Sequence, residues 1–172
     1  MTLFEIEEAV SRMYGIRQHI IVPNISWGLD GLHECDLLVL TKSKYAIEIE
    51  IKRSRADLKK DAQKKHGHKN KIIRKLYFAM PNVMEKYIEF VPEDAGIILC
   101  YKQDDKVYAR VFREAKVDSL APKLTDGQVS QLTRLGCMRI WGLKQKIIKL
   151  QNENNHLKIK QDGKSKQGFN LR

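Results

Sequence analysis

The sequence predicts an α/β fold in which helices flank a central mixed β-sheet and a long helix follows near the C-terminus. Three observations indicate this class. Residues 45–52 alternate with the period of a β-strand: one face carries Tyr45, Ile47, Ile49 and Ile51, and the other carries Ala46, Glu48, Glu50 and Lys52. Two later runs, 76–80 and 95–101, are continuously apolar, as expected of strands inside a sheet that is covered on both faces. From Thr125 onward the apolar residues instead step by three and four, which is the period of a helix.

The first helix is expected to be capped by Thr2 and to extend to about Tyr14. Glu7 falls at the edge of its apolar stripe. The next apolar run, 16–22, predicts the first strand, and 23–31, with its proline and glycines, predicts a connecting loop.

Two neighbouring strands are expected to bring acidic residues together. Residues 33–40 form a short apolar run with carboxylates near its start, and a polar link of only four residues separates it from 45–52, which predicts a hairpin. Glu50 and Lys52 share the polar face of the second strand, and pairing brings Asp36 beside that face.

These three side chains suggest a chemistry. Mg²⁺ prefers oxygen ligands and takes only one or two carboxylates while it keeps several waters. A lysine beside them can orient a water or offset charge that grows on a phosphate. Asp36, Glu50 and Lys52 therefore form a candidate site for metal-dependent phosphodiester hydrolysis. The alternative is a half-exposed strand whose polar face is solvated.

The pattern Asp36, then Glu50-x-Lys52, resembles the PD-(D/E)xK nuclease superfamily, and three blocks in order (48–58, 76–81 and 91–98) are similar to the MmcB type of DNA-repair nuclease. The similarity covers about residues 1–115. It implies a restriction-endonuclease-like core and a Mg²⁺- or Mn²⁺-dependent DNA endonuclease that acts in repair or recombination.

The resemblance also implies a ligand set. Asp36 and Glu50 would hold the metal, the backbone carbonyl of Ile51 would complete the site, and Lys52 would assist catalysis. A glutamate of the first helix often reaches the metal in such enzymes, which makes Glu7 a candidate, although it could equally be a surface acid. Cys35 stands where the superfamily name expects proline, and Glu34 and Glu48 remain open as further ligands.

The net charge of +11 is concentrated in two segments. Residues 52–75 carry eleven Lys or Arg and two acids, and residues 139–172 carry nine and two. Basic surface beside a carboxylate cluster favours a nucleic-acid partner, although charge alone does not distinguish DNA from RNA.

A helix capped by Ser54 and running from Arg55 to about Lys65 would lie along the DNA path. The residues expected to contact DNA are Arg53, Arg55, Lys59, Lys60, Gln63, Lys64 and Lys65.

The remaining segments complete the sheet and add a helix. Residues 82–87 are expected to form a short helix and 107–113 a late strand. In the C-terminal helix, six positions step as the a and d positions of a heptad, with a polar residue at one a position. They are Ile140, Leu143, Ile147, Leu150, Asn154 and Leu157. A parallel homodimer through this helix is one interpretation, and packing on its own domain is the other. A rival to the nuclease is a DNA-binding accessory module that does not cut and uses this coil as its interface.

We expect three parts: a nuclease-like core (1–122), a C-terminal helix (123–160) and a basic disordered tail (161–172). The acidic N-terminus does not match a secretory signal, and no apolar run approaches the ~20 residues of a membrane helix. The three cysteines are widely spaced and form no CxxC pair. A cytoplasmic location is therefore expected, associated with the nucleoid in a bacterium.

Overall fold

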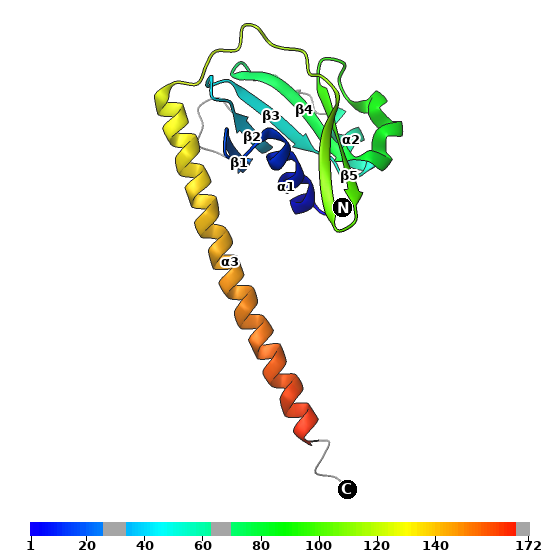
Figure 1. The fold of residues 1–172 in the computed structure, drawn as a ribbon, viewed down its shortest axis with the longest axis vertical. Helices are drawn as coiled ribbons and strands as arrows, with labels where there is room; N and C mark the ends of the chain where they lie inside the picture. Colours follow the sequence, from blue (N-terminus) through cyan, green and yellow to red (C-terminus); the bar gives the residue numbers. More distant parts are fainter. Residues whose placement is uncertain (26–33, 63–69, 168–172) are drawn as a thin grey trace. The chain divides into compact units, whose positions relative to one another are not determined.

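The computed structural model describes residues 1–25, 34–62 and 70–167. Within these ranges six strands form one mixed sheet in sequential order: β1 (Ile20–Ile25), β2 (Cys35–Leu40), β3 (Ala46–Ile51), β4 (Ile73–Pro81), β5 (Gly96–Gln103) and β6 (Lys106–Arg113). The helices are α1 (Leu3–Tyr14), α2 (Arg55–Ala62), the 3₁₀ segment η1 (Asn82–Phe90) and α3 (Asp126–Gln167). The β3–β4 and β4–β5 pairs are parallel and the other three are antiparallel. The predicted α/β class, with helices around a mixed sheet, is confirmed (Figure 1).

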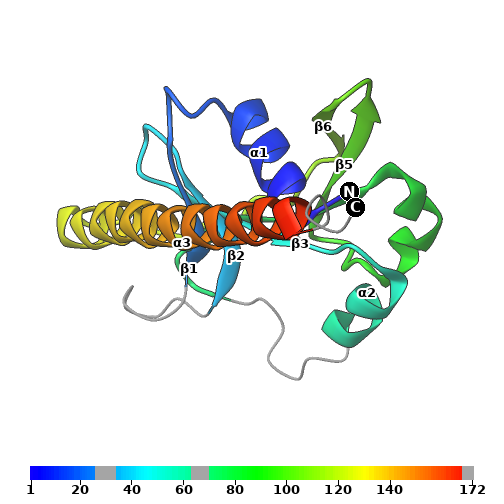
Figure 2. The ribbon, with the colours of Figure 1, turned by 90° about the horizontal axis from the view of Figure 1, so that it is seen from below.

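Helices cover both faces of the sheet, which explains why the central strands are buried along most of their length. On one face, α1 packs Ile6 and Val10 against alternate residues of β3, such as Ile49. On the other face, Leu58 of α2 packs with Phe78 of β4 and with neighbouring residues of η1 and β5. Figure 2 shows α1 and α2 on opposite sides of the sheet.

The ends of α1 follow from local chemistry. Thr2 and Glu5 form a reciprocal capping box, so the predicted start of this helix is confirmed. Gly15 ends the helix with a positive φ of 83°, and its carbonyl accepts the N–H groups of Gln18 and His19 at 2.8 and 3.2 Å.

The predicted strand over 16–22 was placed too early. The turn after Gly15 occupies the residues before Ile20, where β1 begins. The strand also continues through Pro23, which was assigned to a loop but pairs with Leu37. β1 lies at the edge of the sheet, where a proline costs no ladder hydrogen bond.

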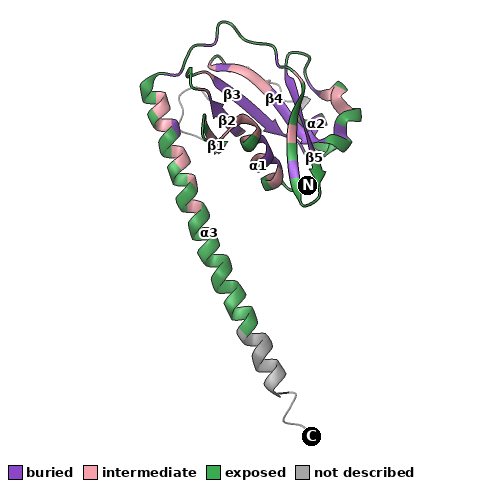
Figure 3. Ribbon diagram, viewed as in Figure 1, coloured by how far each residue is buried: buried purple, intermediate pink, exposed green. Residues whose placement is uncertain are grey.

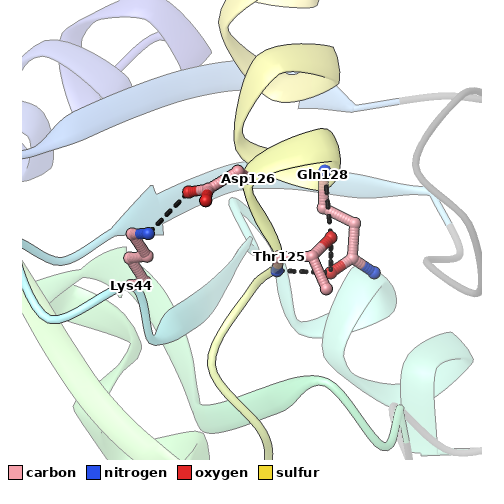
Figure 4. Close-up of polar contacts among 4 residues, drawn as sticks. All are labelled: Lys44, Thr125, Asp126 and Gln128. Carbon is pink, nitrogen blue, oxygen red and sulfur yellow. Dashed lines mark hydrogen bonds and ion pairs between the residues drawn. The ribbon is translucent and has the colours of Figure 1, made fainter.

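The hairpin between β2 and β3 also fixes the start of α3 (Figure 4). Lys44, which has a positive φ of 64° in this turn, accepts a hydrogen bond from the N–H of Leu124 at 2.8 Å. Its Nζ lies 2.6 Å from a carboxylate oxygen of Asp126. Thr125 and Gln128 cap the helix reciprocally, each side chain accepting the other's backbone N–H. The helix predicted from Thr125 therefore begins where the pattern changes.

The chain divides into two compact units, Met1–Gly136 and Cys137–Arg172. The first unit extends past residue 122, because Leu124 and Leu132 pack in the same apolar cluster as β2. α3 remains helical to Gln167, whereas a disordered tail was predicted from residue 161. The only strong helix breaker there is Gly163, and a single glycine costs a helix only about 1 kcal/mol. None of the helices in the described ranges combines the length and apolarity of a membrane span.

Candidate active site

A hollow of about 450 Å³ lies at the C-terminal end of β3, between the first residue of α1 and the polar side of α2. The two strands of the predicted hairpin and both neighbouring helices contribute to its wall. It is lined by Leu3, Glu34, Asp36, Glu50, Ile51, Lys52, Arg53, Asp57 and Lys60. The structure therefore brings together the four residues of β2, β3 and the position after β3 that were predicted for the metal and for catalysis: Asp36, Glu50, Ile51 and Lys52.

Asp36 is fixed by a hydrogen bond to the end of the neighbouring strand. One of its carboxylate oxygens (Oδ2) accepts the backbone N–H of Ile51 at 2.7 Å. The described β2–β3 pairing ends at Leu37 and Ile49, so the Asp36 side chain binds a backbone group beyond the last strand pair. This contact holds the half-buried carboxylate beside Ile51 and leaves its second oxygen available to other donors or to a cation.

Glu50 and Lys52 form an ion pair that is almost completely buried. The Lys52 Nζ lies 2.8 Å from Oε2 of Glu50, and the side chains are only 9% and 6% exposed. The backbone N–H of Lys52 donates to the carbonyl of Ala79 on β4, which extends the parallel pairing and fixes where the side chain starts. Its ammonium also lies 5.7 Å from the ring centroid of Phe78. Because a buried charge is costly without a partner, each of these two charges compensates the other.

Glu7 belongs to the same neighbourhood. Burial raises the pKa of its carboxyl, the negative charge of Asp36 raises it further, and a hydrogen bond from Asn24 at 3.3 Å opposes both effects. The influence of Asp36 means that α1 brings a third carboxylate toward the site. Glu7 itself is half-buried and does not line the hollow.

The two acids left open as further metal ligands, Glu34 and Glu48, lie in different environments. Glu34 is exposed and lines the hollow, whereas Glu48 is completely buried and does not line it. The pKa of the Cys35 thiol responds to the acids around it. Burial raises its pKa, and the charges of Glu48, Glu50 and Asp36 raise it further. Several carboxylates, Asp36 and Glu50 among them, therefore lie near Cys35 at this end of the sheet.

Cations border the acids on the side of α2. Arg53 and Lys60 line the hollow, while Arg55 and Lys59 are exposed on the helix that Ser54 caps, as predicted. The predicted DNA contacts Gln63, Lys64 and Lys65 lie outside the described residues.

Two aromatic rings of η1 lie against these α2 cations. The sequence patterns did not predict these contacts. The Arg55 guanidinium lies 5.3 Å from the ring centroid of Tyr87, and the Lys59 ammonium lies 5.3 Å from that of Phe90. Such cation–π contacts limit where the charges lie on the surface. They join segments about thirty residues apart in the sequence, so no local spacing predicts them.

The oxygen donors fit a small, hard cation. In the described part of the chain, no group of three or more His, Cys, Asp or Glu side chains is arranged to hold a metal. Mg²⁺ does not require such a group, because it binds proteins through one or two carboxylates and keeps several waters. Asp36 and Glu50, with the backbone of Ile51 in the same wall, provide such a set.

The fold and site define an α/β protein with a carboxylate–lysine site at the end of its central sheet. The chain belongs to the MmcB-like family: the family model described as "DNA repair protein MmcB-like" matches residues 2–147. Among solved structures, the chain is similar to a protein of unknown function from Silicibacter pomeroyi at 21% identity, covering 83% of this chain and 88% of that one, with a TM-score of 0.56. That similarity shows the fold alone. No curated protein matches the chain.

Proposed function

We propose that this protein is a divalent-metal-dependent DNA endonuclease of the PD-(D/E)xK type that acts in DNA repair or recombination. The observation that carries the proposal is the meeting of Asp36, Glu50 and Lys52 in one hollow, next to a basic helix. Membership of a family of DNA repair proteins supports DNA as the substrate.

Asp36 and Glu50 would hold Mg²⁺ or Mn²⁺ through their carboxylates, with the backbone carbonyl of Ile51 as a third ligand. The bound cation would supply Lewis-acid polarisation of the phosphate and would offset its charge. The hydrogen bond from Ile51 to Asp36 keeps that carboxylate oriented before any ligand arrives, so little ordering remains to be done on binding. Glu7 would support the site from α1.

Lys52 would act on the attacking water and on the charge that develops at the phosphate. Glu50 holds the ammonium inside the hollow, where a lysine would otherwise extend toward solvent. An ammonium has three donor hydrogens, so one lysine can bind Glu50 and also donate to other acceptors, such as a water or a phosphate oxygen. In a site shielded from water these donors stabilise negative charge strongly.

The basic surface would hold the nucleic acid. Arg53 and Lys60 in the wall, with Arg55 and Lys59 on α2, provide cations for the phosphate backbone without reading its sequence. Gln63, Lys64 and Lys65 would continue this contact. Hydrolysis would leave a 5′-phosphate and a 3′-hydroxyl, as in the superfamily that the sequence resembles.

A second candidate function is a DNA-binding accessory module that does not cut. The Glu50–Lys52 ion pair favours it, because the lysine already compensates the carboxylate without any metal. This module would retain DNA through the basic surface and would use the C-terminal helix as its interface.

A cleavage panel separates the two functions. Wild type and Lys52→Ala are incubated with labelled duplex, nicked, flapped and four-way DNA and with RNA of matched shape, in Mg²⁺, Mn²⁺ or EDTA. We expect metal-dependent cutting of at least one DNA that is lost in the variant, whose fold is checked by circular dichroism. Binding of every DNA without cutting would favour the accessory module, and a preference for RNA would overturn the DNA assignment.

A further inference from the structure

The second unit presents a row of large apolar side chains to solvent. In Figure 3, the part of α3 in this unit whose burial is described is mostly exposed. The row consists of Ile140, Leu143, Ile147, Leu150 and Leu157, each between 49% and 59% exposed. Water contact with five such side chains along one helix is unfavourable, so a partner surface is expected to cover them.

The order of residue types in this row fits a particular partner. The residues step by three and four, with isoleucine at the a positions 140 and 147 and leucine at the d positions 143, 150 and 157. This arrangement favours a parallel, two-stranded coil. We infer that residues 140–157 of α3 form a parallel coiled coil with a second copy of this chain.

Asn154 supports the parallel orientation. It occupies the a position between Leu150 and Leu157 and is exposed in the single chain. In a parallel pair in register, the two Asn154 amides face each other and hydrogen-bond, which satisfies both. An antiparallel pair that keeps the same core layers would instead set Asn154 against Leu143, leaving a polar amide among apolar groups.

One pair of charges beside the core agrees with this register. Glu153 is at a g position and Lys158 at the following e position, so each Glu153 of a parallel pair lies beside Lys158 of the second copy. Glu153 also lies 3.9 Å from Lys149 in its own helix. Residues 140–157 span fewer than three heptads, so the dimer is expected to dissociate on dilution.

The dimer itself does not depend on the proposed nuclease activity. If that activity is present, each particle carries two copies of the candidate site. A parallel coil joins the two copies of the first unit at the same end, because both chains enter the coil at its N-terminal end.

Analytical ultracentrifugation of the full chain over a range of concentrations tests the association. Wild type is expected to have twice its 20.0 kDa chain mass, falling toward one chain mass on dilution. Leu143→Glu/Leu150→Glu should be monomeric throughout. The matched control Gln145→Glu/Asn152→Glu adds the same charge at f positions and should still dimerise. A monomeric wild type, a trimer, or a dimer that survives the Leu143/Leu150 change would overturn the inference.

Crosslinking tests the orientation. In a Cys137→Ser background, which removes the exposed thiol, Ile140→Cys should form an intermolecular disulfide readily, because parallel a positions face each other. An antiparallel pair separates these positions by most of the coil, so a dimer that does not crosslink would overturn the parallel assignment.

Discussion

Replacing Lys52 with methionine removes the cation that pairs with Glu50. The resulting loss of stability should be large because both side chains are buried. Their charged atoms are 2.8 Å apart, and the side chains are 9% and 6% exposed. Breaking a buried pair in this way typically costs about 3–5 kcal/mol, because the remaining charge is left uncompensated. For a chain of this size each kcal/mol lowers Tm by about 2–4 °C, so we expect a decrease of roughly 6–20 °C.

Thermal unfolding followed by circular dichroism at pH 7.5 in EDTA measures this effect. The control is the double variant Glu50→Gln/Lys52→Met, which should regain most of the lost stability because the Glu50 charge is removed together with that of Lys52. Mg²⁺ or Mn²⁺ should raise the Tm of Lys52→Met more than that of wild type, because the Glu50 carboxylate no longer binds Lys52 and can bind the cation instead. A Lys52→Met protein with wild-type Tm, or a double variant as unstable as the single one, would refute the reasoning.

Three further predictions concern neighbouring residues. The raised pKa of Glu7 means that the folded state holds this proton more tightly than the unfolded state, so its charge costs stability at neutral pH and costs nothing below the ordinary value of 4.5. Glu7→Gln should therefore raise the free energy of unfolding at pH 7.5 but not at pH 4, and it should weaken any stabilisation by Mg²⁺. A gain of equal size at both pH values would contradict the assigned cause. In DNA-binding titrations at several salt concentrations, Lys59→Ala should make the negative slope of log affinity against log salt shallower by about 0.9, which is the contribution of one phosphate contact. The control Lys42→Ala, in the turn at the other end of β3, should leave the slope unchanged. Gly96→Ala should lower Tm, with a cost of about 1–3 kcal/mol, because a Cβ there would lie 2.3 Å from the ring of Tyr77; an unchanged melting curve would count against this packing.

Sequence patterns predicted the elements whose signals are local. The capping residues Thr2 and Ser54 and the alternation along β3 all appear in the structure as expected. The start of β1 was missed because Ile16 looks like a strand residue, while the turn that excludes it depends on backbone hydrogen bonds to Gly15. Nor could the sequence show that Pro23 stays in a strand, since that depends on β1 being at the edge of the sheet.

The sequence predicted which residues make up the candidate site, but it did not predict the contacts between them. The spacing of Glu50 and Lys52 on one strand placed them on the same face, yet alternation alone would also fit two solvated side chains. Their burial follows from α2 and η1 covering that face, which is a property of the whole fold. The bond between Asp36 and the backbone of Ile51 joins residues fifteen apart at an irregular strand end, so no residue pattern indicates it.

The central claim is that Asp36 holds a catalytic cation, and single-turnover cleavage measured against Mg²⁺ concentration tests it most directly. The DNA is the one that wild type cuts, and the variants are Asp36→Asn, whose amide oxygen can still accept the N–H of Ile51, and Glu34→Gln, which removes an exposed acid from the same hollow. We expect Asp36→Asn to abolish cleavage at every Mg²⁺ concentration and Glu34→Gln to cut within a few-fold of wild type. Cleavage by Asp36→Asn at the wild-type rate, or cutting by wild type that persists in EDTA, would contradict the account.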